Sequence, residues 1–445
     1  MDDFNTLTWD TGFGYTPTDE DVKNEEEDSK MEFEEEEHQK FVSFTVPNSD
    51  KLQIEICDPQ KESDGSNFFT TYLIKSKNSL EIYSQKENEV RHRYTDFINL
   101  NNALISTYPS CIIPPLPEKK VIESFITGDR FSPEFTERRR NLLEIYMKRI
   151  ARHPVIQNSD ILKNFLESTD MTRAIEQAKN DNNTVLDGIS DSIVNSFSKI
   201  KNTNEKFVKA KEKLDRLEVN LQHVEKLHTN IIKQEKSIEN HMNEFALAAE
   251  KFGETDVDLE NIVNEFSNTL RNVSKNIGEK ATKEENVYVG NIKGYINYCQ
   301  SYKDTLKARD QKQMDFEGLS SYLKSYSDEL KKYENNPAHI SSGITSFVSR
   351  KFDEMKGNDP KLRREEKMIN LQKKIEELKP EVEKSEEDSK RFDDDITKEI
   401  EYFDNFQIMD FRKYLNDYID IQVESHQKNK KLWDDLIEKF ENTTV

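Results

Sequence analysis

The chain has 445 residues, a formal net charge of −22, 34% charged residues and 10% aromatic residues. This length exceeds one typical core, so we expect two or three modules, and the aromatic content excludes a chain that is disordered throughout. The acidic total argues against general nucleic-acid binding, which needs a broadly basic face, but it allows a local basic site.

The cysteines and the hydropathy indicate the compartment. Cys57, Cys111 and Cys299 are far apart, which argues against a disulfide framework or a zinc site of the Cys-x-x-Cys type and favours a reducing compartment. We find no signal peptide and no apolar run long enough to cross a bilayer. The expectation is a cytoplasmic protein that contacts membranes only peripherally.

Residues 1–40 are expected to be a disordered acidic tail. The stretch Asp19–Glu37 contains twelve acidic residues against two lysines, and such a block repels itself. It is interpreted either as a solvating tail or as an autoinhibitory or partner-binding arm, and the sequence leaves both open.

Residues 41–168 have the pattern of a small α+β domain. Leu52, Ile54 and Ile56 alternate with polar residues, and a second strand is predicted at Phe68–Lys75, with Asp58–Asn67 as the turn between them. Helices are predicted at Tyr94–Ser106 and Pro133–His153. Residues 41–166 contain 17 Lys and Arg against 16 Asp and Glu, so the negative charge of the chain lies elsewhere.

Residues 201–441 are predicted to form three long helices, at about 201–251, 256–334 and 361–440. No proline lies between Pro154 and Pro337, and apolar residues recur there at spacings of three and four. One such series is Leu214, Leu217, Leu221, Val224, Leu227 and Ile231. Such helices cannot bury their apolar face alone, so we expect an antiparallel three-helix coiled coil that is extended by dimerisation.

Two breaks and one bend are expected in these helices. The first break is Phe252–Asp258, with Gly253 past one helix end and Thr255 capping the next helix. The second is Asn335–Pro360. Pro380 is expected to bend the third helix, because it removes a backbone hydrogen bond and clashes with the preceding turn.

Two further segments have a second interpretation at membranes. Residues 183–200 place seven apolar side chains on one stripe, which fits either packing at the domain junction or insertion at a membrane interface. The segment Ser346–Arg364 concentrates basic residues between two helices. It is interpreted either as a tip that binds anionic lipid or as a solvated hinge.

Motifs for catalysis are weak. Thr11–Thr16 has two glycines but no preceding strand, so it is not a phosphate loop. His92–Asp96 and Arg309–Gly318 each depart from the kinase motifs they superficially match. We therefore expect no enzyme activity, no cofactor and no metal site.

Three basic clusters in the α+β domain are candidates for anion binding. They lie at Arg91–Tyr94, at the end of Ile112–Lys120, and at Glu137–Ile150. Arginine suits phosphate because its planar fork donates several hydrogen bonds, and lysine adds a mobile charge. Each cluster by itself is more often a solvated face, so a shared pocket is a hypothesis about folding.

An apolar group lies between the second and third clusters. It consists of Val121, Ile122, Phe125 and Ile126. The group is either a loop that packs on its own domain or an apolar wedge that enters lipid while the neighbouring basic residues stay at the headgroups.

Taken together, three motifs resemble a PX (phox homology) domain. They are Arg-Tyr-x-Asp-Phe at Arg93–Phe97, Ile-Pro-Pro-Leu-Pro-x-Lys at Ile113–Lys119, and Arg-Arg-x-x-Leu-x-x-Tyr at Arg139–Tyr146. The resemblance implies a site for phosphatidylinositol 3-phosphate, and it identifies the apolar group as the segment that inserts into membranes.

The same resemblance assigns a role to each site residue. It implies that Arg93 binds the 3-phosphate and that Tyr94 stacks beneath the inositol ring. Lys119 is implied to meet the 1-phosphate, and Arg139 the ring 4- and 5-hydroxyls. Arg91 shares a strand face with Arg93, so it is a candidate for assisting at the surface.

A PX domain followed by three long helices resembles a PX-BAR sorting nexin. The segments Tyr295–Leu323 and Lys356–Lys367 are similar to the sorting nexin 4 subgroup, called autophagy-related protein 24 in fungi. The expected architecture is therefore multidomain, with an α+β PX domain, an amphipathic linker helix (183–200) and an all-α BAR domain.

This resemblance implies a specific function. The chain would bind phosphatidylinositol 3-phosphate on endosomal membranes as a curved homodimer or as a heterodimer with another PX-BAR sorting nexin. Tubular carriers, retrieval of membrane cargo and selective autophagy at the pre-autophagosomal structure would follow. The competing hypothesis is a coiled-coil scaffold that binds partner proteins and carries an incidental basic patch.

Overall fold

The computed structural model describes residues 51–65, 67–117, 131–169, 204–255, 257–335 and 360–443. We call residues 51–169 the N-terminal domain and residues 204–443 the helical region. The predictions for the acidic tail, for the apolar group of Val121, Ile122, Phe125 and Ile126, for the linker helix and for most of the basic segment Ser346–Arg364 lie outside the described residues.

Three antiparallel strands form the sheet of the N-terminal domain in the order β1-β2-β3. They are β1 (Leu52–Asp64), β2 (Asn67–Asn78) and β3 (Glu87–Arg93). In β1, Leu52, Ile54 and Ile56 are buried while Gln53 and Glu55 are exposed, which confirms the predicted alternation. The sheet thus has one face toward the core and one toward solvent.

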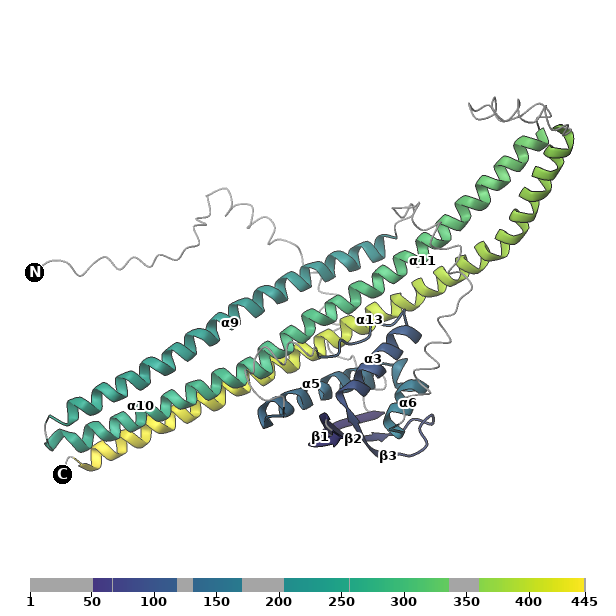
Figure 1. Ribbon diagram of the computed structural model, residues 1–445. Helices are drawn as coiled ribbons and strands as arrows, with labels where there is room; N and C mark the ends of the chain where they lie inside the picture. Colours follow the sequence, from purple (N-terminus) through teal and green to yellow (C-terminus); the bar gives the residue numbers. More distant parts are fainter. Residues whose placement is uncertain are drawn as a thin grey trace, which may run out of the picture. The chain divides into compact units, whose positions relative to one another are not determined.

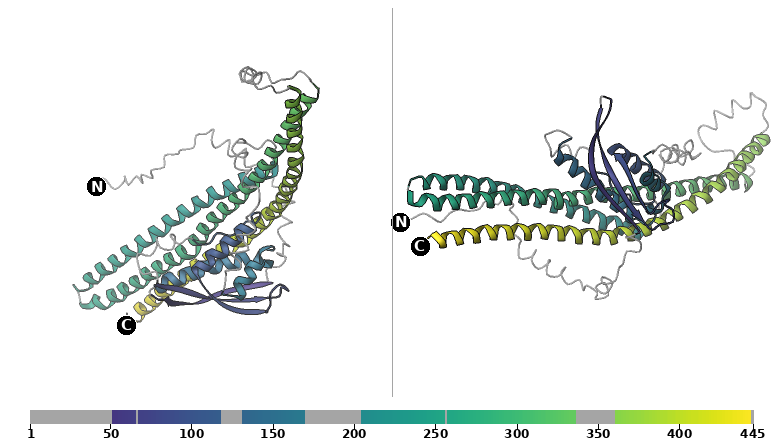
Figure 2. Two further views of the ribbon diagram at one scale, coloured as in Figure 1. Left: turned by 45° about the vertical axis from the view of Figure 1, so that its right-hand side comes forward. Right: turned by 90° about the horizontal axis from the view of Figure 1, so that it is seen from below.

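The predicted turn Asp58–Asn67 is wrong in extent. β1 continues to Asp64 and pairs with β2, with a bulge between Cys57 and Gln60. The chain reverses near Gly65, which has a φ of 65° that glycine adopts without strain. The outer part of this hairpin extends as a ribbon (Figure 2) whose β1 residues are largely exposed. With no face buried, no alternation marks it in the sequence.

Four helical elements accompany the sheet in the described part of the N-terminal domain. They are α3 (Tyr94–Thr107), α5 (Pro133–Arg152), the short η2 (Ile156–Asn158) and α6 (Asp160–Glu167). The start of α5 is defined by Ser132, whose hydroxyl accepts a hydrogen bond from the Phe135 N–H, and by Pro133 in its first turn. Tyr72, Ile74, Phe97, Leu104, Leu143 and Tyr146 belong to the buried core. The two predicted helices are confirmed.

The helical region consists of long helices that follow one another in the chain. They are α9 (Glu205–Gly253), α10 (Val257–Glu284), the π-helical η3 (Glu285–Val289), α11 (Gly290–Asn335) and α13 (Pro360–Thr443). α10, η3 and α11 run on continuously, so three antiparallel helical segments lie side by side (Figure 1). The predicted fold class, an α+β domain followed by a three-helix antiparallel coiled coil, is confirmed.

The break after α9 differs in detail from the prediction. Gly253 is the last helical residue, and its φ is not positive. The Thr255 hydroxyl donates to the Phe252 carbonyl at 2.7 Å, so Thr255 closes the end of α9. The helix ends with hydrogen bonds of the helical type, including one from the Glu254 N–H to the Glu250 carbonyl, and needs no left-handed glycine.

Only part of the predicted apolar seam on α9 is buried within one chain. Leu214 and Leu221 pack in a core with residues of α11 and α13. Val224, Leu227 and Ile231 are exposed by 38%, 53% and 47%. α13 continues through Pro380 as a single long helix. Among the described residues, no helix has the length and apolarity needed to cross a membrane.

Candidate functional site

Arg93 and Tyr94 lie at the junction of β3 and α3. Arg93 is the last residue of the strand, and its backbone N–H donates to the Asp96 carboxylate at 3.0 Å. Burial opposes the ionisation of Asp96, but interactions with His92 and Arg93 outweigh it and lower the pKa of Asp96. The Arg93 side chain is 51% exposed and its Nε is 3.7 Å from Asp96, so its guanidinium can reach an external anion.

Arg139 reaches Tyr94 from α5. Its guanidinium carbon lies 4.7 Å from the centre of the Tyr94 ring and 4.4 Å from that of Phe135, which places the cation against two aromatic faces. The Tyr94 hydroxyl donates to the Pro117 carbonyl. The structure therefore brings Tyr94, Arg139 and the proline-rich segment together, and Arg93 lies next to Tyr94 in the chain.

Tyr72 is a site residue that the sequence reasoning missed. It lies on β2 and pairs with His92 of β3. Desolvation raises its pKa to about 12, although the nearby Arg139 charge opposes this. Within the described part of the chain, the buried Arg139 Nε has no hydrogen-bond partner, and the Tyr72 hydroxyl interacts with the Arg139 side chain. The alternation of buried residues along β2, at Tyr72 and Ile74, is the signal that could have found it.

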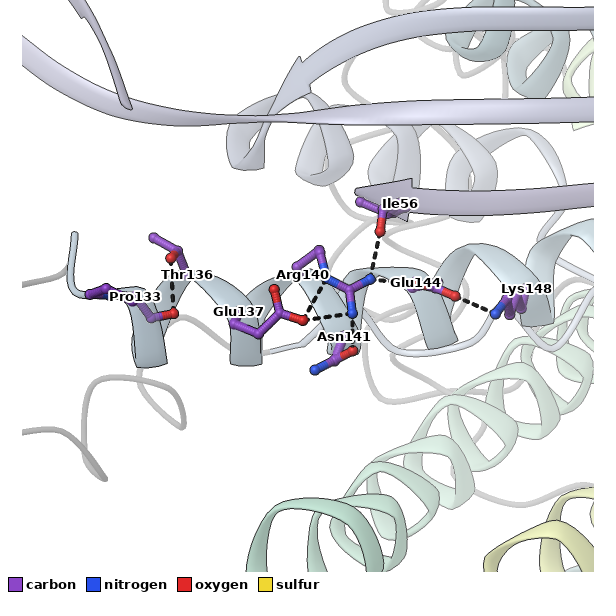
Figure 3. Close-up of polar contacts among 8 residues, drawn as sticks. All are labelled: Ile56, Pro133, Thr136, Glu137, Arg140, Asn141, Glu144 and Lys148. Atoms are coloured by element: carbon purple, nitrogen blue, oxygen red, sulfur yellow. Dashed lines mark hydrogen bonds and ion pairs between the residues drawn. The ribbon is translucent and has the colours of Figure 1, made fainter. Parts of the chain in front are cut away.

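The three consecutive arginines of α5 have different environments. Arg140 forms ion pairs with Glu137 and Glu144 and donates to the Ile56 carbonyl of β1 (Figure 3). Arg138 lines a small cleft beside Pro115 and α11, and burial lowers its pKa. Of the three, Arg139 is the one placed over Tyr94.

Arg91 and His92 contact parts of the domain other than this site. Arg91 forms an ion pair with Asp58 and donates to the Asp58 carbonyl at 3.1 Å, so it holds the bulge in β1. His92 is buried, stacks on Phe165 with ring centres 4.1 Å apart, and bonds to the Phe165 carbonyl at 2.7 Å. Both residues thus have structural partners. Lys119 lies outside the described residues.

A wide groove of the described residues lies elsewhere. It has a volume of about 1200 Å³ and lies between β1, β2, α5 and α13. Its lining mixes both charges, with Lys75, Lys77 and Lys148 beside Glu87, Glu89 and Glu144. A groove of mixed charge does not select an anion, so the Arg93–Tyr94–Arg139 cluster is the better candidate.

Cys111, His153 and Glu399 form a buried group whose potential ligand atoms lie within 4.8 Å of one another. The His153 Nδ1 accepts from the backbone N–H groups of Val155 and Ile156, each at 3.3 Å, so we assign the ring proton to Nε2, which donates to Glu399 at 2.9 Å. A metal-bound imidazole instead donates from its other nitrogen. The geometry fits a hydrogen-bonded cluster better than a metal site.

Comparison with known proteins identifies both parts of the chain. A model of the PX domain matches residues 80–169, and a model described as Vps5 C terminal like matches residues 182–347. The structure of the SNX-BAR Mvp1 tetramer aligns with a TM-score of 0.54 over 86% of this chain and 99% of that chain. Its sequence identity of 19% supports the fold alone.

Curated relatives cover nearly the whole chain. Sorting nexin-4 of Colletotrichum higginsianum is 29% identical, with 100% of this chain and 95% of that protein aligned. Sorting nexin-4 of Emericella nidulans is 30% identical, with 88% and 83% aligned. For Sorting nexin-4 of Cryptococcus neoformans the values are 30%, 91% and 84%.

None of these matches is to a catalytic family. The PX fold, the long helices and the level of identity agree with the resemblance seen in the three motifs. The chain belongs to the PX-BAR sorting nexins, in the sorting nexin 4 subgroup, a family of lipid-binding proteins that act in membrane-associated protein sorting and transport.

Proposed function

We propose that the chain binds phosphatidylinositol 3-phosphate through Arg93, Tyr94, Lys119 and Arg139. The observation that carries this proposal is the position of Arg139, which lies over the Tyr94 ring near the half-exposed Arg93 and whose buried Nε lacks a partner among the described residues. A buried polar group without a partner is costly, and a bound phosphorylated inositol would supply acceptors at this point.

The chemistry of each residue suits this ligand. Arg93 is half exposed and only weakly paired with Asp96, so it is available to the 3-phosphate. Tyr94 offers a ring against which the inositol stacks. Arg139, already held against that ring, would donate to the ring 4- and 5-hydroxyls, and Lys119 would meet the 1-phosphate.

A second part of the proposal concerns the membrane and a second chain. Val121, Ile122, Phe125 and Ile126 would enter the lipid beside the bound headgroup. The exposed apolar residues of α9 (Val224, Leu227, Ile231, Ile238 and Phe245) and of α13 (Ile408, Leu415 and Ile419) would be covered by a second PX-BAR chain. Exposed apolar side chains that recur along one helix are typical of an association surface.

Membership of the sorting nexin 4 subgroup supports a cellular role for these contacts. The chain would be a non-enzymatic peripheral protein of endosomal membranes, with an acidic tail at 1–40, a PX domain at 41–168, an amphipathic linker helix at 183–200 and a BAR domain at 201–441. As a curved dimer it would support tubular carriers that retrieve membrane cargo, and it would act in selective autophagy at the pre-autophagosomal structure.

Co-sedimentation of the full chain with vesicles tests the proposal. Vesicles that differ only in the phosphoinositide are compared, and we expect pelleting to require the 3-phosphate. Binding that is the same with all phosphoinositides would refute the lipid assignment. Absence of pelleting, together with dimer formation and partner binding, would support the scaffold hypothesis instead.

A further inference from the structure

The end of α5 is joined to α13 by a set of buried charged and polar groups. Arg149 and His153 of the PX domain are 7% and 2% exposed, and Glu399 and Asp410 of α13 are 3% and 8% exposed. Charged side chains are rarely this buried unless they are paired. Separating the two domains at this contact would therefore leave buried charged groups without their partners.

Asp410 is the acidic partner of two arginines. Arg152 donates two hydrogen bonds to its carboxylate at 2.6 and 2.7 Å, and the Arg149 Nε is 3.5 Å away. Arg149 also donates to the Tyr414 hydroxyl at 2.5 Å. Desolvation opposes the charge of Arg149, but Tyr414 and Asp410 outweigh it and raise its pKa. Both arginines thus stay charged within the contact.

Glu399 is the second acidic anchor. It accepts a hydrogen bond from the His153 Nε2 and one from the backbone N–H of Ile112, each at 2.9 Å. The Ile112 side chain is 1% exposed and belongs to the core of the helical region. The PX domain is therefore held at two points, the end of α5 and the start of the proline-rich segment.

The same two elements carry the proposed lipid site. Arg139 lies on α5 ten residues before Arg149, about 15 Å along a rigid helix. The proline-rich segment runs from Ile112 to Pro117, whose carbonyl accepts the Tyr94 hydroxyl. Any rotation of the PX domain on α13 would thus turn the lipid site with it.

A buried ion pair between two domains is compatible with few relative orientations of those domains. Removing charges from water is costly, and the cost is recovered only when each charge meets its partner in good geometry. Such pairs contribute little net stability, but they disfavour alternative packings. A freely jointed PX domain would leave Arg149, Arg152 and Asp410 without this compensation.

We propose that Arg149, Arg152 and His153 with Glu399, Asp410 and Tyr414 form an interdomain latch that fixes the angle of the lipid site relative to the BAR helices. This inference rests on the proposed lipid function. When these contacts are formed, the PX and BAR domains bind a membrane as one rigid unit. Binding at the lipid site then favours binding of the BAR helices, and the reverse. Arg152 and Asp410 are then positioning residues that do not touch the lipid.

The test compares Asp410→Asn with Asp393→Asn in the full-length protein. Asp393 accepts two hydrogen bonds from Arg309, at 2.7 and 3.0 Å, but does so within the helical region. Both variants remove the charge of an aspartate on α13 that pairs with an arginine of another helix. Of the two, Asp410 is the one that pairs with the PX domain. Asn keeps the shape of Asp, and an unchanged far-ultraviolet circular dichroism spectrum of each variant is the control for folding.

Two readouts report the latch without lipid. The first is alkylation of Cys111, which is buried beside Glu399, measured for each cysteine by mass spectrometry. The second is hydrogen exchange of the segment that contains the Ile112 amide. We expect both rates to rise at least about tenfold in Asp410→Asn and to stay at the wild-type level in Asp393→Asn, since opening exposes these groups.

Two further readouts report the membrane. Affinity for a soluble short-chain phosphatidylinositol 3-phosphate should remain within about twofold of wild type in Asp410→Asn. Binding to vesicles that carry this lipid should fall at least about tenfold, because avidity between linked sites is worth this much or more. A merely structural role would not separate the two affinities.

Three outcomes would overturn the inference. The first is an equal response of Cys111 in the two variants, which would show that no latch exists. The second is an equal loss of affinity for the soluble lipid and for the vesicles, which would show that Asp410 acts on the lipid site itself. The third is an open latch with unchanged vesicle binding. If the wild-type protein failed to bind the vesicles, the proposed lipid function would be refuted. The interdomain latch would still be tested, because Cys111 alkylation and hydrogen exchange at Ile112 need no lipid.

Discussion

The arginine triplet of α5 offers a sharp prediction, because neighbouring residues of one kind have separate roles. We expect Arg139→Gln to weaken binding of phosphatidylinositol 3-phosphate with little change in stability. Arg140→Gln should do the opposite. The two variants make the same chemical change one position apart, so each is the control for the other.

The magnitudes follow from the contacts. Arg139 lies over two rings, at 4.7 and 4.4 Å, and each such contact contributes about 0.5–1 kcal/mol. Its unpaired buried Nε already costs on the order of 1 kcal/mol, so its removal should change the free energy of unfolding by less than about 1 kcal/mol. Lost charge-assisted bonds to the ligand are worth about 1.5–3 kcal/mol, or roughly 10- to 150-fold in affinity.

Arg140→Gln loses the bond to the Ile56 carbonyl and the ion pairs with Glu137 and Glu144. The bond to the carbonyl is charge-assisted and joins α5 to β1, so we expect a loss of about 2 kcal/mol in stability. Glu144 keeps its other partner, Lys148. Ligand affinity should stay within about twofold, because nothing near Tyr94 changes.

Calorimetric titration with a soluble short-chain lipid measures the affinities, and urea denaturation measures the stabilities. If Arg140→Gln lost affinity while Arg139→Gln kept it, the assignment of the ligand arginine would be wrong. If both variants bound as wild type, the site itself would be refuted.

The remaining predictions concern the membrane and the dimer. Arg93→Ala should abolish vesicle binding that depends on the 3-phosphate, and unchanged co-sedimentation would exclude Arg93 from the site. Phe125→Ser should weaken vesicle binding but spare the soluble headgroup, because only a bilayer receives an apolar wedge; equal loss in both assays would indicate misfolding. The double variant Leu227→Glu, Ile231→Glu should convert a dimer to a monomer by light scattering. A wild-type monomer at micromolar concentration would instead require a different partner chain.

Much of the architecture could be predicted because helical periodicity and strand alternation are local signals. The strand at Leu52–Ile56 and the helix at Pro133–His153 have a buried face that the sequence displays directly. The outer hairpin could not be predicted, since its polar residues pair through the backbone and show no alternation. The extent of β1 therefore came only from the structure.

The candidate site was predicted in part for a similar reason. The sequence motifs contain Arg93, Tyr94 and Arg139, so these residues could be recognised from the sequence. Tyr72 lies near these residues because β2 pairs with β3 in one particular register. A local sequence pattern does not predict the register between two separate strands. The contacts of Arg149 and Arg152 with Asp410 span 258 residues or more, which no spacing rule detects.

The π-helical η3 has a consequence for how the long second helix is built. Buried residues are three positions apart before it, at Ala281 and Glu284, and again from its last residue onward, at Val289 and Ile292. Across η3 the interval is five. One extra residue shifts the phase of the helical repeat by about 100°. The wider π-helical turn absorbs this shift, so Glu284 and Val289 are both buried although they are five residues apart. Deletion of one residue there would restore a plain α-helix and leave the later side chains on their present face. A plain α-helix of the present length would instead turn every later side chain away from its partner helix by about 100°.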